Sequence, residues 1–194
     1  MIRYDSKTAL IVVDVQNDFA DTDGGLYVPS GEDVIPVVNR EIERARQAGA
    51  LVVYTQDWHP ERTPHFATDG GVWPVHCVAD TWGAGFHPDL IVDGPVVRKG
   101  TGGEDGYSGF TIRDPATGEE RATELSGLLR QRGVTSVVIV GLALDYCVKA
   151  TALDAARAQL RTSVLADGTR AVDLRQGDGE RARVELAAAG VTVV

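Results

Sequence analysis

The chain has 194 residues, of which 43% are hydrophobic, so it can enclose one full core but is short for two domains of ordinary size. Its formal net charge of -9, with no compensating stripe of lysine and arginine, argues against nucleic acid as a partner. The first apolar run, Ala9–Val13, ends at Asp14 and is too short for a signal peptide or a membrane span, so we expect a cytoplasmic protein without membrane contact.

Short runs rich in Val and Ile recur along the chain and predict buried strands. In chain order, these strands are Ala9–Val13, Leu51–Tyr54, Val96–Val97, Val137–Val140, Thr162–Leu165 and Val191–Val194. Segments with helical spacing lie between most of them and predict the helices Val34–Gln47, Glu124–Arg132, Tyr146–Ala158 and Gly179–Ala189. This alternation predicts one α/β domain over residues 1–194, with a mainly parallel central sheet and helices on both faces.

Two long stretches, Asp57–Gly94 and Gly100–Arg121, show no clear periodicity. Loops of that length inside a compact domain are usually functional or mobile. His87 and Cys77 lie in the first stretch, and we expect His87 to be structural and Cys77 to serve packing. Since ligand crevices of parallel sheets lie beyond the carboxyl ends of the strands, we look for reactive side chains at those ends.

Three reactive side chains follow predicted strands. Asp14 follows the first in IVVDVQNDF, Lys99 follows another in PVVRKG, and Cys147 follows a third in VVIVGLALDYC. The carboxyl ends of parallel strands share one edge, so we expect these side chains to meet in one crevice. A lysine cation and a helix N-terminus both favour a thiolate, which predicts Cys147 as nucleophile and Asp14 as proton shuttle. Taken singly, each residue would more often be structural.

A second group of candidate residues lies in QDWHPERTPHF and VWPVHC. It consists of Asp57, His59, His65 and His76. A carboxylate with imidazoles is a ligand set suited to zinc, iron or manganese, and alternate residues of an extended segment point to the same side. The group therefore predicts one divalent metal ion. A structural zinc site away from any pocket remains an alternative.

Together, the segments DVQNDF, QDWHP, WPVHC and GLALDYCV and the strand-end Lys99 resemble the isochorismatase-like cysteine hydrolases, and within them the nicotinamidase/pyrazinamidase family. The resemblance spans nearly the whole chain and implies a three-layer α/β/α fold of Rossmann-like type. It implies hydrolysis of nicotinamide to nicotinate and ammonia, a step of pyridine nucleotide salvage. Activity on pyrazinamide, the identity of the metal, and the choice between monomer and homo-oligomer stay open.

The resemblance also implies roles for individual residues. These are a catalytic triad of Asp14, Lys99 and Cys147, metal ligation by Asp57, His59 and His76, which His65 joins in some members, and pocket walls from Phe19, Trp73 and Leu142. The backbone N–H groups of Ala143 and Cys147 are implied as an oxyanion hole, with a cis peptide between Leu142 and Ala143. An ordinary strand-to-helix turn with Asp145 as N-cap is compatible with the same segment.

These roles describe a reaction in two halves. Cys147 attacks the carboxamide carbon while Asp14 protonates the departing ammonia, and water activated by Asp14 then hydrolyses the thioester. Two other functions remain as alternatives. An amidase acting on a carbamoyl or ureido substrate would not need the metal motif, and a catalytically silent module that binds a partner would not need the triad.

Overall fold

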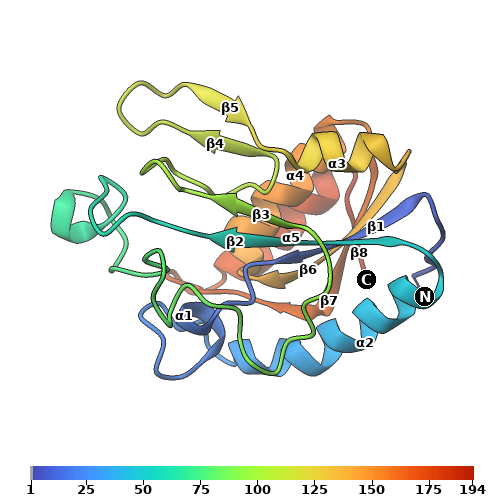
Figure 1. Ribbon diagram of the computed structural model, residues 1–194, viewed down its shortest axis with the longest axis horizontal. Helices are drawn as coiled ribbons and strands as arrows, with labels where there is room; N and C mark the ends of the chain where they lie inside the picture. Colours follow the sequence, from blue (N-terminus) through green and yellow to red (C-terminus); the bar gives the residue numbers. More distant parts are fainter. Residues whose placement is uncertain (1) are drawn as a thin grey trace.

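The computed structural model describes residues 2–194, and its centre is a six-stranded sheet (Figure 1). Adjacent strands pair in parallel in the order β3-β2-β1-β6-β7-β8. The strands are β1 (Thr8–Val13), β2 (Leu51–Asp57), β3 (Val96–Lys99), β6 (Ser136–Leu142), β7 (Arg161–Arg170) and β8 (Thr192–Val193). This arrangement confirms the predicted parallel α/β sheet.

Helices cover both faces of the sheet (Figure 1). They are α1 (Asn17–Ala20), α2 (Val34–Gln47), α3 (Leu125–Gln131), α4 (Lys149–Arg157) and α5 (Asp178–Ala188), with the 3-10 turns Gly31–Asp33 and Ala67–Asp69. Within residues 2–194, no helix has both the length and the apolar composition that a membrane span requires.

Strand β1 shows how the two faces are filled. Its alternate residues Leu10 and Val12 pack with α2, whereas Ile11 and Val13 pack with α3, α4 and α5, and all four are fully buried. A strand buried on both faces needs apolar residues at successive positions, which is why the predicted strands read as unbroken runs rather than as alternating patterns.

The second predicted loop contains an antiparallel hairpin that the sequence pattern did not predict. It consists of β4 (Thr111–Arg113) and β5 (Glu120–Ala122). The two strands are short and largely exposed, so they have no buried face to impose an alternating apolar pattern. The connecting turn is stabilised by Asp114, whose carboxylate accepts hydrogen bonds from the N–H groups of Ala116 (2.8 Å) and Thr117 (3.0 Å).

Gly141, near the carboxyl end of β6, leaves no room for a side chain against the neighbouring strand β1. Gly141 has a φ of 107°, and a Cβ atom there would lie 2.0 Å from the carbonyl oxygen of Val13 in β1. Val13 immediately precedes Asp14, so this glycine permits the ends of β1 and β6 to lie side by side. The consequence is that groups following the two strands reach the same edge of the sheet.

We expect Gly141→Ala to lower the free energy of unfolding by about 2–3 kcal/mol, because a methyl group there overpacks the strand pair and L-residues disfavour this φ. Urea denaturation followed by circular dichroism measures the change. Gly127→Ala is the control, since Gly127 lies in α3 with open space around its Cα and should be neutral or slightly stabilising. Equal stability of the Gly141 variant and the native protein would contradict the prediction.

Candidate functional site

The structure brings Asp14, Lys99 and Cys147 together at the carboxyl edge of the sheet. The Lys99 ammonium lies 2.8 Å from Asp14 Oδ2 and 3.6 Å from Cys147 Sγ. All three side chains are buried, with Lys99 only 1% exposed. The convergence predicted from the strand ends is therefore present in the fold. Lys99 is the last residue of β3, and its side chain lies inside the protein rather than on the surface.

Asp14 is held by the neighbouring strand β2. Its backbone φ is 48°, and its N–H donates to the carbonyl of Thr55 at 3.3 Å. The Thr55 hydroxyl in turn donates to Asp14 Oδ1 at 2.7 Å. One carboxylate oxygen is thus fixed by Thr55 while the other faces Lys99, and a carboxylate oxygen of Asp14 lies within 4.8 Å of Cys147 Sγ.

Lys99 also forms an ion pair with Asp57, a contact that the sequence did not predict. Asp57 is the last residue of β2, and it lies opposite Lys99 in the β2–β3 register. The side-chain amide of buried Gln16 fixes it further, donating to the Asp57 carbonyl and accepting from the Asp57 N–H, both at 2.8 Å. Asp57 therefore joins the reactive cluster to the histidines beyond it.

Burial governs the protonation of this cluster. Burial alone would lower the pKa of Lys99, but the carboxylates of Asp14 and Asp57 outweigh it and hold the pKa well above its usual range. Burial raises the pKa of Asp14, and it raises that of the Cys147 thiol well above its usual range. Lys99 opposes both shifts, as expected from the sequence, but its effect on the thiol is smaller than that of burial. Burial thus favours the neutral thiol, and Lys99 favours the thiolate.

Cys147 lies in a π-helical turn, Leu144–Val148, directly before α4 rather than in the first turn of an α-helix. The carbonyl of Ala143 accepts hydrogen bonds from the N–H groups of Tyr146 and Val148, the two neighbours of Cys147, both at 3.1 Å. The peptide bond between Leu142 and Ala143 is cis, in agreement with the resemblance. Ala143 and Cys147 both line the pocket described below.

Asp145 is not the N-cap of this turn, contrary to the alternative considered from the sequence. Its carboxylate accepts hydrogen bonds from the backbone N–H groups of Val172 (3.0 Å) and Asp173 (2.9 Å), which follow β7. The Asp145 side chain points to the segment after β7 because it supplies acceptors for two backbone N–H groups of that segment. Asp145 thereby fixes Val172, which lines the pocket beside Cys147.

The four predicted metal ligands form a second buried cluster next to the first. Asp57 Oδ2 lies 3.8 Å from His59 Nε2 and 4.0 Å from His76 Nε2. Candidate ligand atoms of His59, His65 and His76 all lie within 4.8 Å of one another. Two atoms that each bind one ion at about 2.0–2.2 Å are at most about 4.4 Å apart, so the Asp57 distances suit a shared divalent ion.

The hydrogen bonding of the histidines tests whether they fit a metal. His59 is fully buried, and neither of its ring nitrogens has a hydrogen-bond partner among the described residues. His76 donates from Nδ1 to the carbonyl of Pro74 at 2.7 Å, so its Nε2 lone pair is available. Burial also lowers the pKa of His76 to about 4, which keeps the ring in the neutral form that binds metals. The residues present therefore fit a divalent ion.

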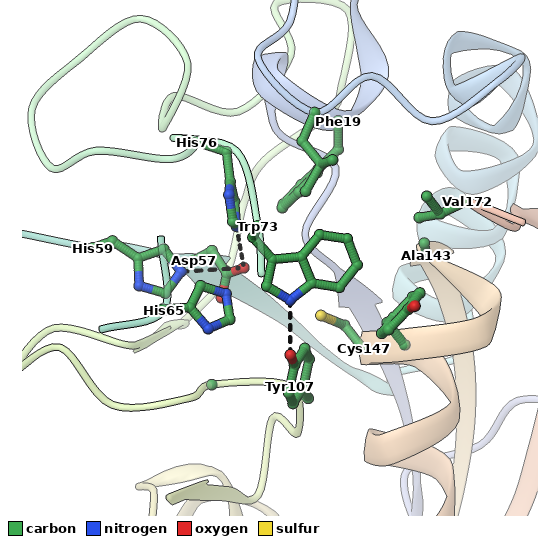
Figure 2. Close-up of a pocket in the computed structure, with 13 residues that line it drawn as sticks. Phe19, Asp57, His59, His65, Trp73, His76, Tyr107, Ala143, Cys147 and Val172 are labelled. Atoms are coloured by element: carbon green, nitrogen blue, oxygen red, sulfur yellow. Dashed lines mark hydrogen bonds and ion pairs between the residues drawn. The ribbon is translucent and has the colours of Figure 1, made fainter. Parts of the chain in front are cut away.

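One mainly apolar pocket is lined by the nucleophile of the first cluster and by the second cluster (Figure 2). Cys147 and the four candidate ligands line it, together with the predicted wall residues Phe19 and Trp73. In Figure 2 the histidines gather on one side of Trp73 and Cys147 lies on the other. A flat aromatic molecule could thus contact the thiol and the histidine cluster at the same time.

The prediction of Leu142 as a pocket wall is wrong. Leu142 is fully buried and packs in the hydrophobic cluster that includes α2, because alternate residues of β6 point to opposite faces of the sheet. Two tyrosines that the sequence analysis did not identify line the pocket instead. Tyr107 accepts a hydrogen bond from Trp73 Nε1 at 2.8 Å, and Tyr146 packs edge-on against the Trp73 ring. Tyr146 directly precedes Cys147 in the sequence, and this position indicates that its side chain lies near the pocket. No sequence feature indicates the same for Tyr107.

The remaining two candidates behave as expected from the sequence. Cys77 is buried with its N–H donating to Asp18 Oδ2 at 2.6 Å, and burial raises its thiol pKa. His87 lies outside the pocket, where its Nδ1 accepts the N–H of Asp89 at 3.2 Å. Cys77 packs in the core on the α2 side of the sheet, and the contacts of the His87 ring are local and polar.

Comparison with known proteins gives one consistent family. Residues 8–194 match the model of the isochorismatase domain. The chain is 36% identical to a nicotinamidase of Escherichia coli, with 95% of this chain and 93% of that protein covered. Its structure is similar to that of a pyrazinamidase of Pyrococcus horikoshii in complex with zinc (TM-score 0.86, 41% identity, 97% and 98% covered). It is also similar to PnC1 of L. infantum in complex with nicotinate (TM-score 0.90, 35% identity, 100% and 95% covered).

Proposed function

This chain belongs to the isochorismatase domain family and to its nicotinamidase/pyrazinamidase group, and we propose that it hydrolyses nicotinamide to nicotinate and ammonia through a thioester on Cys147. The observation that carries the proposal is that the buried thiol and the Asp/His cluster line the same apolar pocket. We propose further that residues 1–194 act as one domain in the cytoplasm.

The aromatic walls determine what the pocket accepts. Phe19, Trp73, Tyr107 and Tyr146 surround a space suited to a flat ring, and the pocket lining, as formed by residues 2–194, includes no lysine or arginine to attract an anionic substrate. An uncharged aromatic carboxamide fits this lining. Nicotinate in the L. infantum structure and the pyrazinamidase activity named for the P. horikoshii protein support the same class of ligand.

Asp57, His59 and His76 would hold one divalent metal ion, with His65 as a fourth ligand. When bound, this ion supplies a positive centre that attracts the ring nitrogen of a pyridine and so orients the carboxamide toward Cys147. Zinc in the P. horikoshii neighbour supports a divalent ion, and the donor set suits iron or manganese as well.

The first half of the reaction forms the thioester. Burial raises the pKa of the Cys147 thiol, so its proton passes to Asp14 as sulfur attacks the carboxamide carbon. The raised pKa of Asp14 makes it a better proton acceptor than an ordinary aspartate. The N–H groups of Ala143 and Cys147 bind the oxyanion, while the C–N bond breaks and Asp14 returns the proton to the departing ammonia.

The second half regenerates the enzyme. A water molecule loses one proton to Asp14 and attacks the thioester carbon, the C–S bond breaks, and sulfur takes that proton from Asp14. The second water proton stays on the nicotinic acid that forms and passes to solvent as nicotinate leaves. Lys99 stays charged throughout because the carboxylates of Asp14 and Asp57 hold its pKa well above its usual range. It therefore orients the carboxylate and the thiol without exchanging a proton.

Incubating the purified protein with nicotinamide and measuring ammonia and nicotinate tests the function directly. We expect both products in equal amounts. Release of ammonia from a ureido or carbamoyl compound but not from nicotinamide would overturn the proposal in favour of the alternative amidase. Absence of turnover with every such substrate would favour the non-catalytic module.

We expect prolonged dialysis against a chelator to abolish nicotinamide hydrolysis while changing the thermal unfolding midpoint only slightly. The reason is that the ligands lie in loops and at a strand end beside the pocket, whereas the two hydrophobic clusters of the core do not depend on them. Ammonia release and circular dichroism on the same sample measure both effects. Unfolding of the chelated protein would instead indicate a structural metal site.

A further inference from the structure

His65 has a neighbour that none of the roles above uses. Asp105 Oδ1 lies 2.7 Å from His65 Nδ1, and the His65 side chain is 5% exposed. The two residues come from the two long segments that connect the strands, so the contact joins parts of the chain 40 positions apart. Asp105 is itself fixed, because its backbone exchanges two hydrogen bonds with Arg113 of β4, at 2.8 and 2.9 Å.

The chemistry of this contact determines which nitrogen of His65 is available. A carboxylate has no hydrogen to donate and can only accept a hydrogen bond, so the proton of a neutral His65 ring that bonds to it resides on Nδ1. The lone pair is then on Nε2. The ring lies stacked on His59, with centroids 4.8 Å apart, and belongs to the group of histidines whose ligand atoms lie within 4.8 Å of one another.

We propose that Asp105 is a positioning residue that holds the His65 ring with Nε2 directed at the metal, which makes His65 the fourth protein ligand in this chain. A histidine whose second nitrogen donates to a carboxylate is both oriented and made more basic, and loss of such a partner typically weakens metal binding. The inference rests on the proposed function only in that both require this cluster to bind a divalent ion.

The loop that carries His65 has a second attachment, which allows the role of Asp105 to be tested separately from folding. The hydroxyl of Thr63 donates to the carbonyl of Gly103 at 2.9 Å and accepts the N–H of His65 at 3.2 Å. These contacts hold the backbone of the loop near the segment that carries Asp105. Removing the Asp105 carboxylate therefore frees the ring of His65 and leaves the backbone around it in place.

The experiment is a competition between the purified protein and a chelating dye for Zn²⁺, with nicotinamide absent. We expect Asp105→Ala to weaken zinc binding roughly 10- to 100-fold. Asp105→Asn, whose amide oxygen can still accept from His65, should recover part of the affinity. Asp114→Ala is the matched control, because it removes the carboxylate of the residue next to Arg113, which stabilises the hairpin turn and has no hydrogen bond or ion pair with His65 among the described residues. It should leave zinc binding unchanged.

Two further measurements separate positioning from a general structural effect. In a His65→Ala background, adding Asp105→Ala should weaken zinc binding no further, because the partner that it orients is absent. In the cobalt-substituted protein, Asp105→Ala and His65→Ala should produce the same change in visible absorption. Unchanged zinc affinity of Asp105→Ala, or an additive loss in the double variant, would overturn the inference. Failure of the native protein to bind Zn²⁺ would also overturn it, whereas nicotinamide hydrolysis measured separately would still decide the proposed function.

Discussion

Replacement of Cys147 by alanine should lower the rate of nicotinamide hydrolysis by a factor on the order of 10³ or more while substrate binding persists, as for nucleophile deletions in other covalent mechanisms. The variant keeps the histidine cluster and the aromatic walls, which bind the ring, and loses only the atom that forms the thioester. Steady-state ammonia release measures the rate. Trp73 lines the pocket, so titration of tryptophan fluorescence with nicotinamide measures binding.

His59→Ala is the contrasting variant, since it retains the thiol and removes a candidate metal ligand. Its affinity for nicotinamide should fall together with its rate, and excess metal should restore part of the activity. If Cys147→Ala retained substantial turnover, the thiol would not be the nucleophile, and direct attack by an activated water would become the better mechanism.

Replacement of Lys99 by methionine should destabilise the metal-free protein by about 3–5 kcal/mol and remove its activity when metal is added back. Lys99 is the shared cation of two buried carboxylates, Asp14 and Asp57, and methionine of similar length leaves both without a counter-charge. Urea denaturation of the metal-free protein measures the loss of stability. A metal ion would partly neutralise Asp57, so it must be absent from that measurement.

Lys149→Met provides the matched control for this prediction. Lys149 also pairs with a carboxylate, that of Glu185 at 2.9 Å, but both side chains are partly exposed to solvent. Water screens such a pair, and its removal should change the free energy of unfolding by about 1 kcal/mol at most. If the two variants lost similar amounts of unfolding free energy, Lys99 would contribute no more to stability than a surface lysine. That result would contradict the prediction that burial makes its ion pairs important.

The sequence predicted which groups meet because strand ends can be located from local patterns. Asp14, Lys99 and Cys147 each end or follow an apolar run, and the carboxyl ends of parallel strands lie along one edge. The contact between Lys99 and Asp57 could not be predicted in the same way. It depends on the register of β3 against β2, which places the two residues opposite each other, and no local pattern encodes that register.

Other features of the fold and of the pocket also depend on contacts that local sequence patterns do not encode. The resemblance implied Leu142 as a pocket wall, but Leu142 is the last residue of β6 and its side chain is fully buried in the core, whereas Ala143 after it reaches the pocket. The β4–β5 hairpin lacks a buried face, so its strands carry no apolar alternation. Tyr107 reaches the pocket from a segment without periodicity. Its hydrogen bond with Trp73 exists only in the folded chain, so no sequence pattern indicated that Tyr107 lines the pocket.

The position of Asp57 between Lys99 and the histidines limits how the metal preference of this protein can evolve or be redesigned. Exchanging Asp57 for a neutral ligand such as histidine would alter the ion that is bound and would also remove a counter-charge from Lys99, so catalysis would change with it. His65 and Asp105 have no contact with Lys99 among the described side-chain interactions. Substitutions at His65 or Asp105 can therefore change the metal preference without removing a counter-charge from Lys99. A substitution at Asp57 changes metal binding and catalysis together.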